Sequence, residues 1–289
     1  MSIQRLEILN KVVQLQNITK AATELNLSQS GISYAIKNLE EELDVKLLVR
    51  NRSGVKLTKE GESIYRHSLL VTNAYDNLLQ EAAALKGVEK GTIHVGTFAS
   101  VTTNWIPEII TVFKEEFPGI TIKIYEGDDY LSLESAVLSG ELDCCFSIVS
   151  DKSQLDYVPL QKDKLYCIVS NDNPLCKQEV MEISQIENYP LIKPKAGWDS
   201  EISNFFSSHN LNPVIAYEVS DDQSILALVQ ANLGINIRPG LVLKNRTSNI
   251  TALDLEEDAY RMIALATGSH VSHATEKFIS IVTELFQEV

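Results

Sequence analysis

The sequence of 289 residues lacks the features that identify membrane and secreted proteins. No apolar run approaches the roughly 20 residues that a membrane-spanning helix requires. The first residues, MSIQRLEILNKVV, lack the basic leader, apolar stretch and small-residue cleavage site of an export signal. The four cysteines are too few for a disulfide framework in a chain of this size: Cys144, Cys145, Cys167 and Cys176. We therefore expect a cytoplasmic protein that has no membrane partner.

Sequence motifs of common enzymes are absent as well. The chain has no GxSxG nucleophile motif, no phosphate-binding loop and no dinucleotide-binding fingerprint. Of the five histidines, His270 and His273 lie close together near an expected helix start, where solvated surface histidines are commoner than metal sites. The expectation is a protein that is not an enzyme and that holds no metal and no cofactor.

Positive charge is also scarce, but it is unevenly distributed. The formal net charge is -14, which argues against a nucleic-acid partner for the chain as a whole. Residues 1–61 nevertheless hold nine Lys and Arg against seven Asp and Glu, whereas residues 62–289 hold sixteen against thirty-two. A binding module is therefore joined to a strongly acidic remainder, and only the module can approach phosphate without strong repulsion.

The spacing of apolar residues predicts three helices in this first module. Residues 3–15 carry leucine and valine at helical spacing, and Thr19 is a candidate N-cap for a short second helix over residues 20–25. Ser28 is a candidate N-cap for a third helix, which has this inward stripe: Ile32, Ala35, Ile36, Leu39 and Leu43. A short helix, a tight turn and a longer helix with a polar start form a helix-turn-helix.

Polar residues on the outward face of the third helix favour DNA recognition over plain helical packing. Four of them are expected to read bases: Gln29, Ser30, Ser33 and Tyr34. Residues 46–57 predict two short strands around a basic turn, which together form a wing. Contacts with the DNA backbone are expected from Thr19, Ser28, Lys37, Arg50, Arg52 and Lys56. The alternative is a solvated basic hairpin beside a three-helix bundle.

The same residues form a pattern in which many fixed spacings agree: Ala21-Ala22, Leu25, Ser28-Gln29-Ser30, Ser33, Ile36, Leu39-Glu40, Leu43, Leu47, Arg50, Leu57-Thr58 and Gly61. The pattern resembles the N-terminal signature of the LysR-type transcriptional regulators over residues 3–65. Two positions depart from it, since Asp44 stands where glycine is usual after the third helix and Leu48 where phenylalanine is usual. Asp44 is a candidate to alter the turn into the wing, but neither departure removes an expected DNA contact.

A long amphipathic helix is expected over residues 59–86, capped by Thr58 and ended by Gly87. Its stripe has the 4-3-4-3 spacing of a coiled coil: Ile64, Ser68, Val71, Tyr75, Leu78, Ala82 and Leu85. The stripe is narrow and its flanks are polar, which favours a partner helix over packing within one domain. The resemblance implies the same, because LysR-type regulators dimerise through such a helix. We expect a dimer or tetramer held by Val71, Tyr75, Leu78, Ala82 and Leu85.

Strand and helix patterns alternate beyond Gly91. The expected strands cover residues 92–97, 120–125, 143–148, 165–169, 234–239 and 262–266, and the expected helices cover 104–116, 131–139 and 274–286. This order implies an α/β fold with a largely parallel sheet. It resembles the two-subdomain sensor of LysR-type regulators, which is similar to periplasmic solute-binding proteins. The expected domains are a winged helix-turn-helix (1–58), a linker helix (59–87), sensor subdomain I (91–162 and 266–289) and subdomain II (163–265); the return of the chain to subdomain I is implied by the resemblance alone.

Two such subdomains enclose a cleft, and ligands of α/β sheets bind beyond the carboxyl ends of the strands. The segment 98–103 offers hydroxyl and backbone N–H groups to an anion, although these groups equally suit the capping of their own helix. By family position, residues 127–129, 147–148 and 195–200 also border the cleft. The expected effector-binding residues are Ser100, Thr102, Thr103, Asp128, Ser147, Lys195, Trp198, Asp199 and Asp221. Lys195 suits a carboxylate and the aspartates suit an amine, which leaves the effector's chemistry open.

The expected function is a transcription regulator whose binding to double-stranded promoter DNA is switched by a small-molecule effector, with RNA polymerase as a further partner. One alternative is a solute-binding protein without a DNA role, which the missing export signal opposes. Another is a redox-sensing regulator that uses Cys167 and Cys176, which do not lie where peroxide-sensing relatives carry their pair. A third is an enzyme with a DNA-binding appendage, for which no catalytic constellation is visible.

Overall fold

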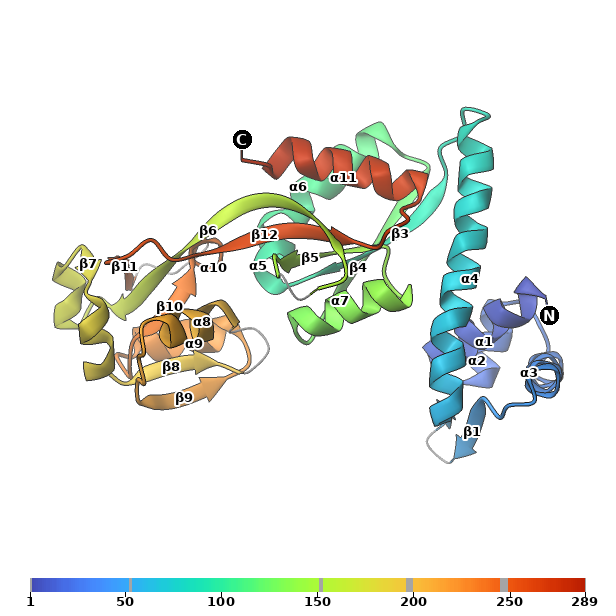
Figure 1. The fold of residues 1–289 in the computed structure, drawn as a ribbon, viewed down its shortest axis with the longest axis horizontal. Coiled ribbons are helices and arrows are strands. Elements are labelled where there is room, and N and C mark those ends of the chain that lie inside the picture. Colours follow the sequence, from blue (N-terminus) through green and yellow to red (C-terminus); the bar gives the residue numbers. More distant parts are fainter. Residues whose placement is uncertain (1, 52–53, 151–152, 196–199, 245–248, 289) are drawn as a thin grey trace.

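The computed structural model describes residues 2–51, 54–150, 153–195, 200–244 and 249–288. The molecule is elongated (Figure 1). The winged helix-turn-helix, which we call the reading head, lies at one end, and the two sensor subdomains lie toward the other. The long helix α4 (Lys59–Ala84) stands between them. Within the described ranges no helix is both long enough and apolar enough to cross a membrane.

The reading head consists of helices α1 (Ile3–Leu15), α2 (Ile18–Glu24) and α3 (Gln29–Leu43), followed by strands β1 (Leu48–Asn51) and β2 (Gly54–Leu57). The three helices and the wing enclose one apolar core. The predicted three helices and two-stranded wing are therefore confirmed. The predicted cap of the second helix is wrong, because Asn17 lies at the N-cap and its side chain accepts a hydrogen bond from the Lys20 amide.

Helix α4 begins where the sequence predicted. Thr58 is its N-cap and accepts a hydrogen bond from the Gly61 amide at 2.8 Å. The helix ends at Ala84, and a turn follows in which Gly87 has a φ of 71°. Such a positive φ favours glycine, which explains the stop at this position.

Sensor subdomain I is built from β3 (Gly91–Thr97), α5 (Ala99–Asn104), α6 (Ile106–Glu116), β4 (Ile120–Glu126), α7 (Tyr130–Ser139) and β5 (Cys144–Ile148). Strand β3 pairs in parallel with β4 and β5. The expected helix over 104–116 matches α6, which starts at Ile106 with a proline in its first turn and ends at Glu116, whereas α5 is a further helix over Ala99–Asn104. The expected loop over 98–103 is thereby largely helical.

Subdomain II contains β7 (Val180–Met181), β8 (Leu191–Pro194), α8 (Ser200–Ser208), β9 (Ile215–Val219), α9 (Asp222–Gln230), β10 (Asn236–Pro239), α10 (Gly240–Leu243) and β11 (Ile250–Leu255). The short 3₁₀ helices η1 (Pro174–Lys177) and η2 (Ile183–Asn188) complete it. A second apolar core lies between these elements, separate from that of subdomain I.

Two long strands join the subdomains, β6 (Asp156–Ser170) and β12 (Tyr260–Thr267). Strand β12 is antiparallel to both β5 and β6, and β10 and β11 are antiparallel to β6. The expectation of a largely parallel sheet is therefore wrong at the crossing, because the chain enters and leaves subdomain II along neighbouring strands that run in opposite directions. Helix α11 (His273–Phe286) packs beside α6, so the chain ends on subdomain I (Figure 1).

Candidate DNA-reading head and effector cleft

The polar start of α3 lies on the surface of the reading head. Ser28 caps the helix by accepting a hydrogen bond from the Gly31 amide at 3.0 Å. The inward residues Ile32, Ile36 and Leu39 are buried. The opposite face therefore points outward: Gln29, Ser30, Tyr34 and Lys37 are exposed, Tyr34 to 68%, while Ser33 is half-buried. This is the arrangement that a recognition helix needs, with an apolar face for its own core and a polar face for base edges.

Several of the predicted backbone-contacting residues have protein partners as well. Ser28 and Ser30 share a hydrogen bond at 3.0 Å, and Lys37 lies 3.4 Å from the Glu41 carboxylate. Thr19 is exposed in the first turn of α2, where its carbonyl accepts a hydrogen bond from Thr23. These contacts are at the surface, so solvent or phosphate can replace them at little cost.

The wing is held to the helices by a buried carboxylate. Glu40 Oε1 accepts hydrogen bonds from the amides of Leu47 at 2.9 Å and Leu48 at 3.2 Å, and Lys46 Nζ lies 2.7 Å from Oε2. Burial alone would raise the pKa of Glu40, but these hydrogen bonds outweigh it and hold the pKa below its usual range. Glu40 therefore fixes where the chain leaves α3 and enters β1.

Glycine is needed at the tip of the wing, where Gly54 has a φ of 123° and a Cβ would lie 2.6 Å from the Gln16 carbonyl oxygen. Lys56 is exposed on β2. The backbone of Arg50 pairs with that of Val55, but the Arg50 side chain and the whole of Arg52 lie outside the described residues.

Helix α4 has different surroundings along its length. Near its start, Ser68 Oγ donates to Asn10 Oδ1 at 2.5 Å and Asn10 Nδ2 donates to Thr72 Oγ1 at 3.0 Å, which ties α4 to α1. The later members of the predicted seam are exposed, including Leu78 at 62% and Leu85 at 81%. The seam therefore packs on its own reading head only at Ile64 and Ser68, and from Val71 onward it is open to solvent.

The interior between the two sensor subdomains holds a network of charges centred on Arg261 of β12. Its Nε and Nη2 lie 2.9 Å and 2.8 Å from Asp163 Oδ2, and Nη2 also donates to Ser100 Oγ at 2.9 Å. Nη1 donates to the Tyr130 hydroxyl at 2.9 Å and lies 3.6 Å from Glu201 Oε1. Ser100 and Tyr130 belong to subdomain I and Glu201 to subdomain II, so one buried guanidinium ties both halves together.

A cleft of about 160 Å³ lies beside this network. Its lining comes from both subdomains: Phe98, Ala99, Ser100, Glu126, Gly127, Tyr130, Pro194, Ser220, Asp221, Asp222, Arg238, Val242 and Arg261. Arg238 of β10 is buried and forms an ion pair with Asp222 of α9. Asp221 is the N-cap of α9 and accepts from the Ser224 amide at 2.8 Å, which holds the pKa of its carboxyl below the usual range together with the Ser224 hydroxyl.

The predicted effector residues are only partly brought together. Ser100 and Asp221 line the cleft. Thr102 donates to the Phe98 carbonyl, and Thr103 and Asp128 are exposed outside the lining. Ser147 is buried and donates to Glu134 at 2.7 Å, and Lys195 is exposed at the end of β8. Trp198 and Asp199 lie outside the described residues.

Sequence reasoning missed the cleft's buried charges, Arg238, Arg261, Glu201 and Asp163. One signal was available: arginine interrupts two otherwise apolar strand patterns, at Arg238 in Ile237-Arg238-Pro239 and at Arg261 before Met262. Charged residues are almost never buried without a partner, so an arginine within an apolar strand marks a candidate functional position.

Comparisons with known proteins bear on both regions. Residues 3–62 match the family model described as "Bacterial regulatory helix-turn-helix protein, lysR family", and residues 86–287 match the model described as "LysR substrate binding domain". The second match alone spans more than half of the chain. The chain belongs to the LysR family.

Named relatives extend along the whole chain. The transcriptional regulator BenM of Acinetobacter baylyi is 29% identical over 92% of this chain and 90% of its own length. The uncharacterised regulator YvbU of Bacillus subtilis is 28% identical over 99% of both chains. The full-length structure of OxyR C199D from Pseudomonas aeruginosa shares the fold with a TM-score of 0.81, at 21% identity over 98% of this chain and 94% of its own. This LysR-family protein is thus a DNA-binding transcription regulator with an effector-binding domain.

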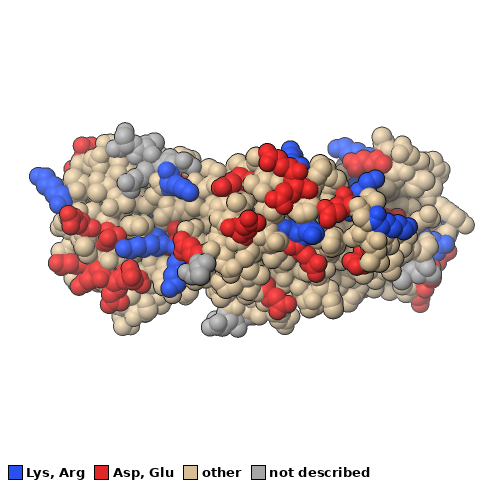
Figure 2. Space-filling view, turned by 90° about the horizontal axis from the view of Figure 1, so that it is seen from above, with Lys and Arg blue, Asp and Glu red and all other residues tan. Residues whose placement is uncertain are grey.

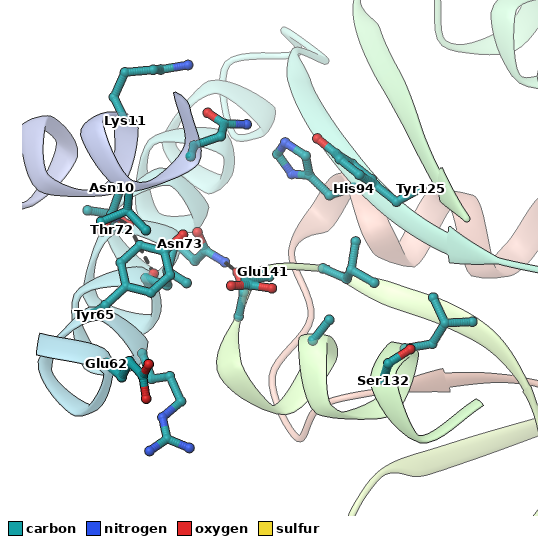
Figure 3. Close-up of a pocket in the computed structure, with 18 of the residues that line it drawn as sticks. Asn10, Lys11, Glu62, Tyr65, Thr72, Asn73, His94, Tyr125, Ser132 and Glu141 are labelled. Carbon is teal, nitrogen blue, oxygen red and sulfur yellow. Dashed lines mark hydrogen bonds between the residues drawn. The ribbon is translucent and has the colours of Figure 1, made fainter. Parts of the chain in front are cut away.

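A groove of about 890 Å³ separates the reading head of this LysR-family regulator from sensor subdomain I (Figure 3). Asn10, Tyr65 and Thr72 line it on the side of α1 and α4, whereas His94 and Tyr125 lie across from them on the sensor. At the side of the groove, Asn73 Nδ2 donates to the Gly140 carbonyl at 2.6 Å. Helix α4 also contacts α11, so the reading head meets the sensor through the linker helix.

The cysteines do not form a reactive pair in the structure. Cys167 is fully buried in β6, and burial raises the pKa of its thiol to about 12. All four cysteines are free. Because the thiolate is the reactive species, Cys167 is a poor redox group, and the redox alternative is not favoured.

On the face drawn in Figure 2, acidic and basic side chains are interspersed from one end of the molecule to the other, and one group of acidic side chains gathers at the end formed by subdomain II. Across the described ranges no cluster of three or more His, Cys, Asp or Glu side chains is placed to hold a metal ion.

Proposed function

We propose that this LysR-family regulator binds a two-part promoter site as a homodimer or tetramer and that a small molecule in the sensor cleft switches this binding. The observation that carries the proposal is the exposed polar start of α3 above a buried apolar face. Helix α3 and the wing both lie within residues 1–61, which hold nine Lys and Arg against seven Asp and Glu, whereas residues 62–289 hold sixteen against thirty-two.

In this proposal Gln29, Ser30, Ser33 and Tyr34 read base edges in the major groove. Contacts with phosphate come from Thr19, Ser28, Lys37, Lys56 and the two wing arginines, Arg50 and Arg52. The working units are the reading head (1–58), the linker (59–87) and the two sensor subdomains (91–162 with 266–289, and 163–265). The boundaries between the two sensor subdomains, after residues 162 and 265, fall within β6 and β12, the strands that both subdomains share.

Dimerisation is assigned to the open part of the α4 seam, which consists of Val71, Tyr75, Leu78, Ala82 and Leu85. Exposed apolar side chains at coiled-coil spacing support this assignment, because a second copy of α4 would remove them from water. Pairing two copies would also pair two recognition helices with two half-sites.

The effector is proposed to change the relative position of the two subdomains. Through the contacts of α4 with the sensor, this change would alter the angle of the reading heads. The proposal includes contact with RNA polymerase at the promoter, residence in the cytoplasm where promoter DNA lies, and no catalytic turnover of the effector.

Gln29 provides the test of the reading assignment. Gln29→Ala is expected to weaken binding to a DNA fragment from upstream of the protein's own gene by roughly 1–3 kcal/mol, because one bidentate base contact is lost. Binding to random DNA should be unchanged. Fluorescence anisotropy at two salt concentrations measures both.

Lys37→Ala serves as the matched control, because a lost phosphate contact weakens specific and random binding alike. An equal loss on both DNAs for Gln29→Ala would overturn its assigned role.

A further inference from the structure

One buried donor in the sensor cleft has no partner. Arg238 is 4% exposed, lines the cleft and pairs with Asp222 through Nη2. Among the described residues, its Nε, which is itself buried, has no hydrogen-bond partner. An unpaired buried N–H is costly and rare in folded proteins, and in a residue that lines a cavity it is a candidate donor to a ligand.

The second arginine of the cleft shows the contrast. Arg261 directs Nε, Nη1 and Nη2 to Asp163, Tyr130, Ser100 and Glu201, and its guanidinium also lies over the Phe98 ring at 5.0 Å. A ligand could bind Arg261 only by displacing one of these contacts. Arg238 can accept a ligand without losing its ion pair.

The charge of the lining limits what that ligand can be. Besides the two arginines, Glu126, Asp221 and Asp222 line the cleft, and Arg261 is already neutralised by Asp163. A group with two negative charges, such as phosphate or a dicarboxylate, would be repelled by these carboxylates in surroundings where charges are weakly screened. A single carboxylate satisfies the donor with a short charge-assisted hydrogen bond and adds only one negative charge.

The size of the cleft points the same way. A volume of about 160 Å³ is below the roughly 300–1,000 Å³ of pockets for drug-sized ligands, which favours a small organic acid over a nucleotide or a sugar phosphate.

We propose that the effector of this regulator is a small monocarboxylate whose carboxylate accepts a hydrogen bond from Arg238 Nε. This inference rests on the proposed function, in which the cleft is the effector site. The carboxylate can belong to a simple acid or to a zwitterion such as an amino acid, in which case the ammonium group faces Glu126 and Asp221. Both sources share the same contact with Arg238.

The test is a thermal-shift series on the full-length protein with probes matched in carbon skeleton. Acetate, isovalerate and 3-phenylpropanoate form the acid arm, glycine, L-valine and L-phenylalanine form the zwitterion arm, and the amides of the three acids are neutral controls. Phosphate and succinate represent dianions. At least one carboxylate should raise the unfolding midpoint by mass action, whereas its amide should not.

Arg238→Lys retains a cation beside Asp222 but lacks the Nε donor, and it should weaken the apparent Kd of the stabilising carboxylate by about 10- to 100-fold. Arg238→Gln combined with Asp222→Asn removes the whole ion pair and should abolish the shift without leaving an unpaired charge. Lys244→Gln removes one positive charge from an exposed position outside the lining and should leave the shift unchanged.

The inference fails if none of the six carboxylates stabilises the protein, if dianions bind more tightly, or if Arg238→Lys retains the full shift. DNA binding by the unliganded protein is measured in parallel. It distinguishes failure of the carboxylate inference from failure of the proposed function. A neutral compound that alters promoter binding would leave the proposed function standing and overturn the carboxylate assignment.

Discussion

The reading head and the sensor cleft use polar groups in opposite ways. The reading head places its apolar residues in one core and its functional side chains on the surface, as at Tyr34 and Lys37. The cleft instead carries charge in the interior, where Arg238, Arg261 and Glu201 are all buried. The exposed side chains of the reading head suit a large charged partner such as DNA. The buried charges of the cleft suit a small ligand that matches them closely.

This difference has an energetic consequence. A surface charge costs little and contributes little, because water and salt screen it. Burial disfavours the charged form of Glu201 and raises the pKa of its carboxyl, although Arg261 and Arg238 oppose this shift. The sensor therefore depends on complete pairing of its charges, and loss of one partner should cost far more there than in the reading head.

Removing the central cation of the cleft should have the largest effect. Arg261→Met leaves Asp163 and Glu201 buried without their cation, and we expect a loss of about 3–5 kcal/mol in the free energy of unfolding of the sensor. Urea unfolding followed by the fluorescence of Trp105, buried in subdomain I, measures it. Adding Asp163→Asn to Arg261→Met should restore part of the loss; no recovery would mean that packing rather than charge explains the effect.

The second largest effect is expected on the association of two copies and not on the stability of the folded monomer. Leu78→Glu places a charge in the exposed part of the α4 seam, and we expect the dimer to weaken by about 3 kcal/mol, about 1.5 from each copy. The unfolding midpoint of the monomer should hardly change. Analytical ultracentrifugation measures the association constant.

Leu79→Glu is the matched control for Leu78→Glu, because Leu79 is exposed at 48% but lies outside the 4-3-4-3 stripe. If both variants weaken the dimer equally, the seam is not the interface that the spacing predicts.

The reading head also contains a buried carboxylate, that of Glu40. Glu40→Gln should reduce the free energy of unfolding of the reading head by about 2 kcal/mol at neutral pH, since hydrogen bonds to a charged acceptor are lost. Because the folded-state pKa of Glu40 lies below its ordinary value of 4.5, this contribution is complete above that value. It is lost as the pH falls through the folded-state pKa.

Stability curves of wild type and Glu40→Gln from pH 7 to pH 3 provide the measurement. The two curves should converge in acid. A difference that stays constant with pH would assign the effect to packing and not to the charge of Glu40.

The smallest effect should come from the turn that ends α3. Asp44 has a φ of 51° at the C-cap, in the left-handed region that favours glycine. The sequence predicted that Asp44 alters the turn into the wing, but Asp44 adopts the same left-handed conformation that glycine adopts freely. Asp44→Gly should raise the thermal midpoint slightly, by up to about 1 kcal/mol in stability, and a fall would show that the Asp44 side chain stabilises the turn.

The helices of the reading head and the linker could be predicted from the amino-acid sequence. Their helices follow from local signals, namely apolar spacing over residues 3–15, the caps Ser28 and Thr58, and the stop at Gly87. Even the error at Thr19 was small, since Asn17 caps the same helix two residues earlier. Local signals suffice here because each element of the reading head contacts its neighbours along the chain.

The cleft, in contrast, depends on contacts between residues that are far apart in the sequence. Ser100 and Arg261 are 161 positions apart, and Asp163 lies between them on a strand that both subdomains share. Sequence reasoning placed Ser147 and Lys195 at the ligand, but Ser147 donates to Glu134 in the interior and Lys195 is exposed at the end of β8. A buried ion network is fixed by which strands cross and in which direction they run, and that is a property of long-range pairing that no local pattern encodes.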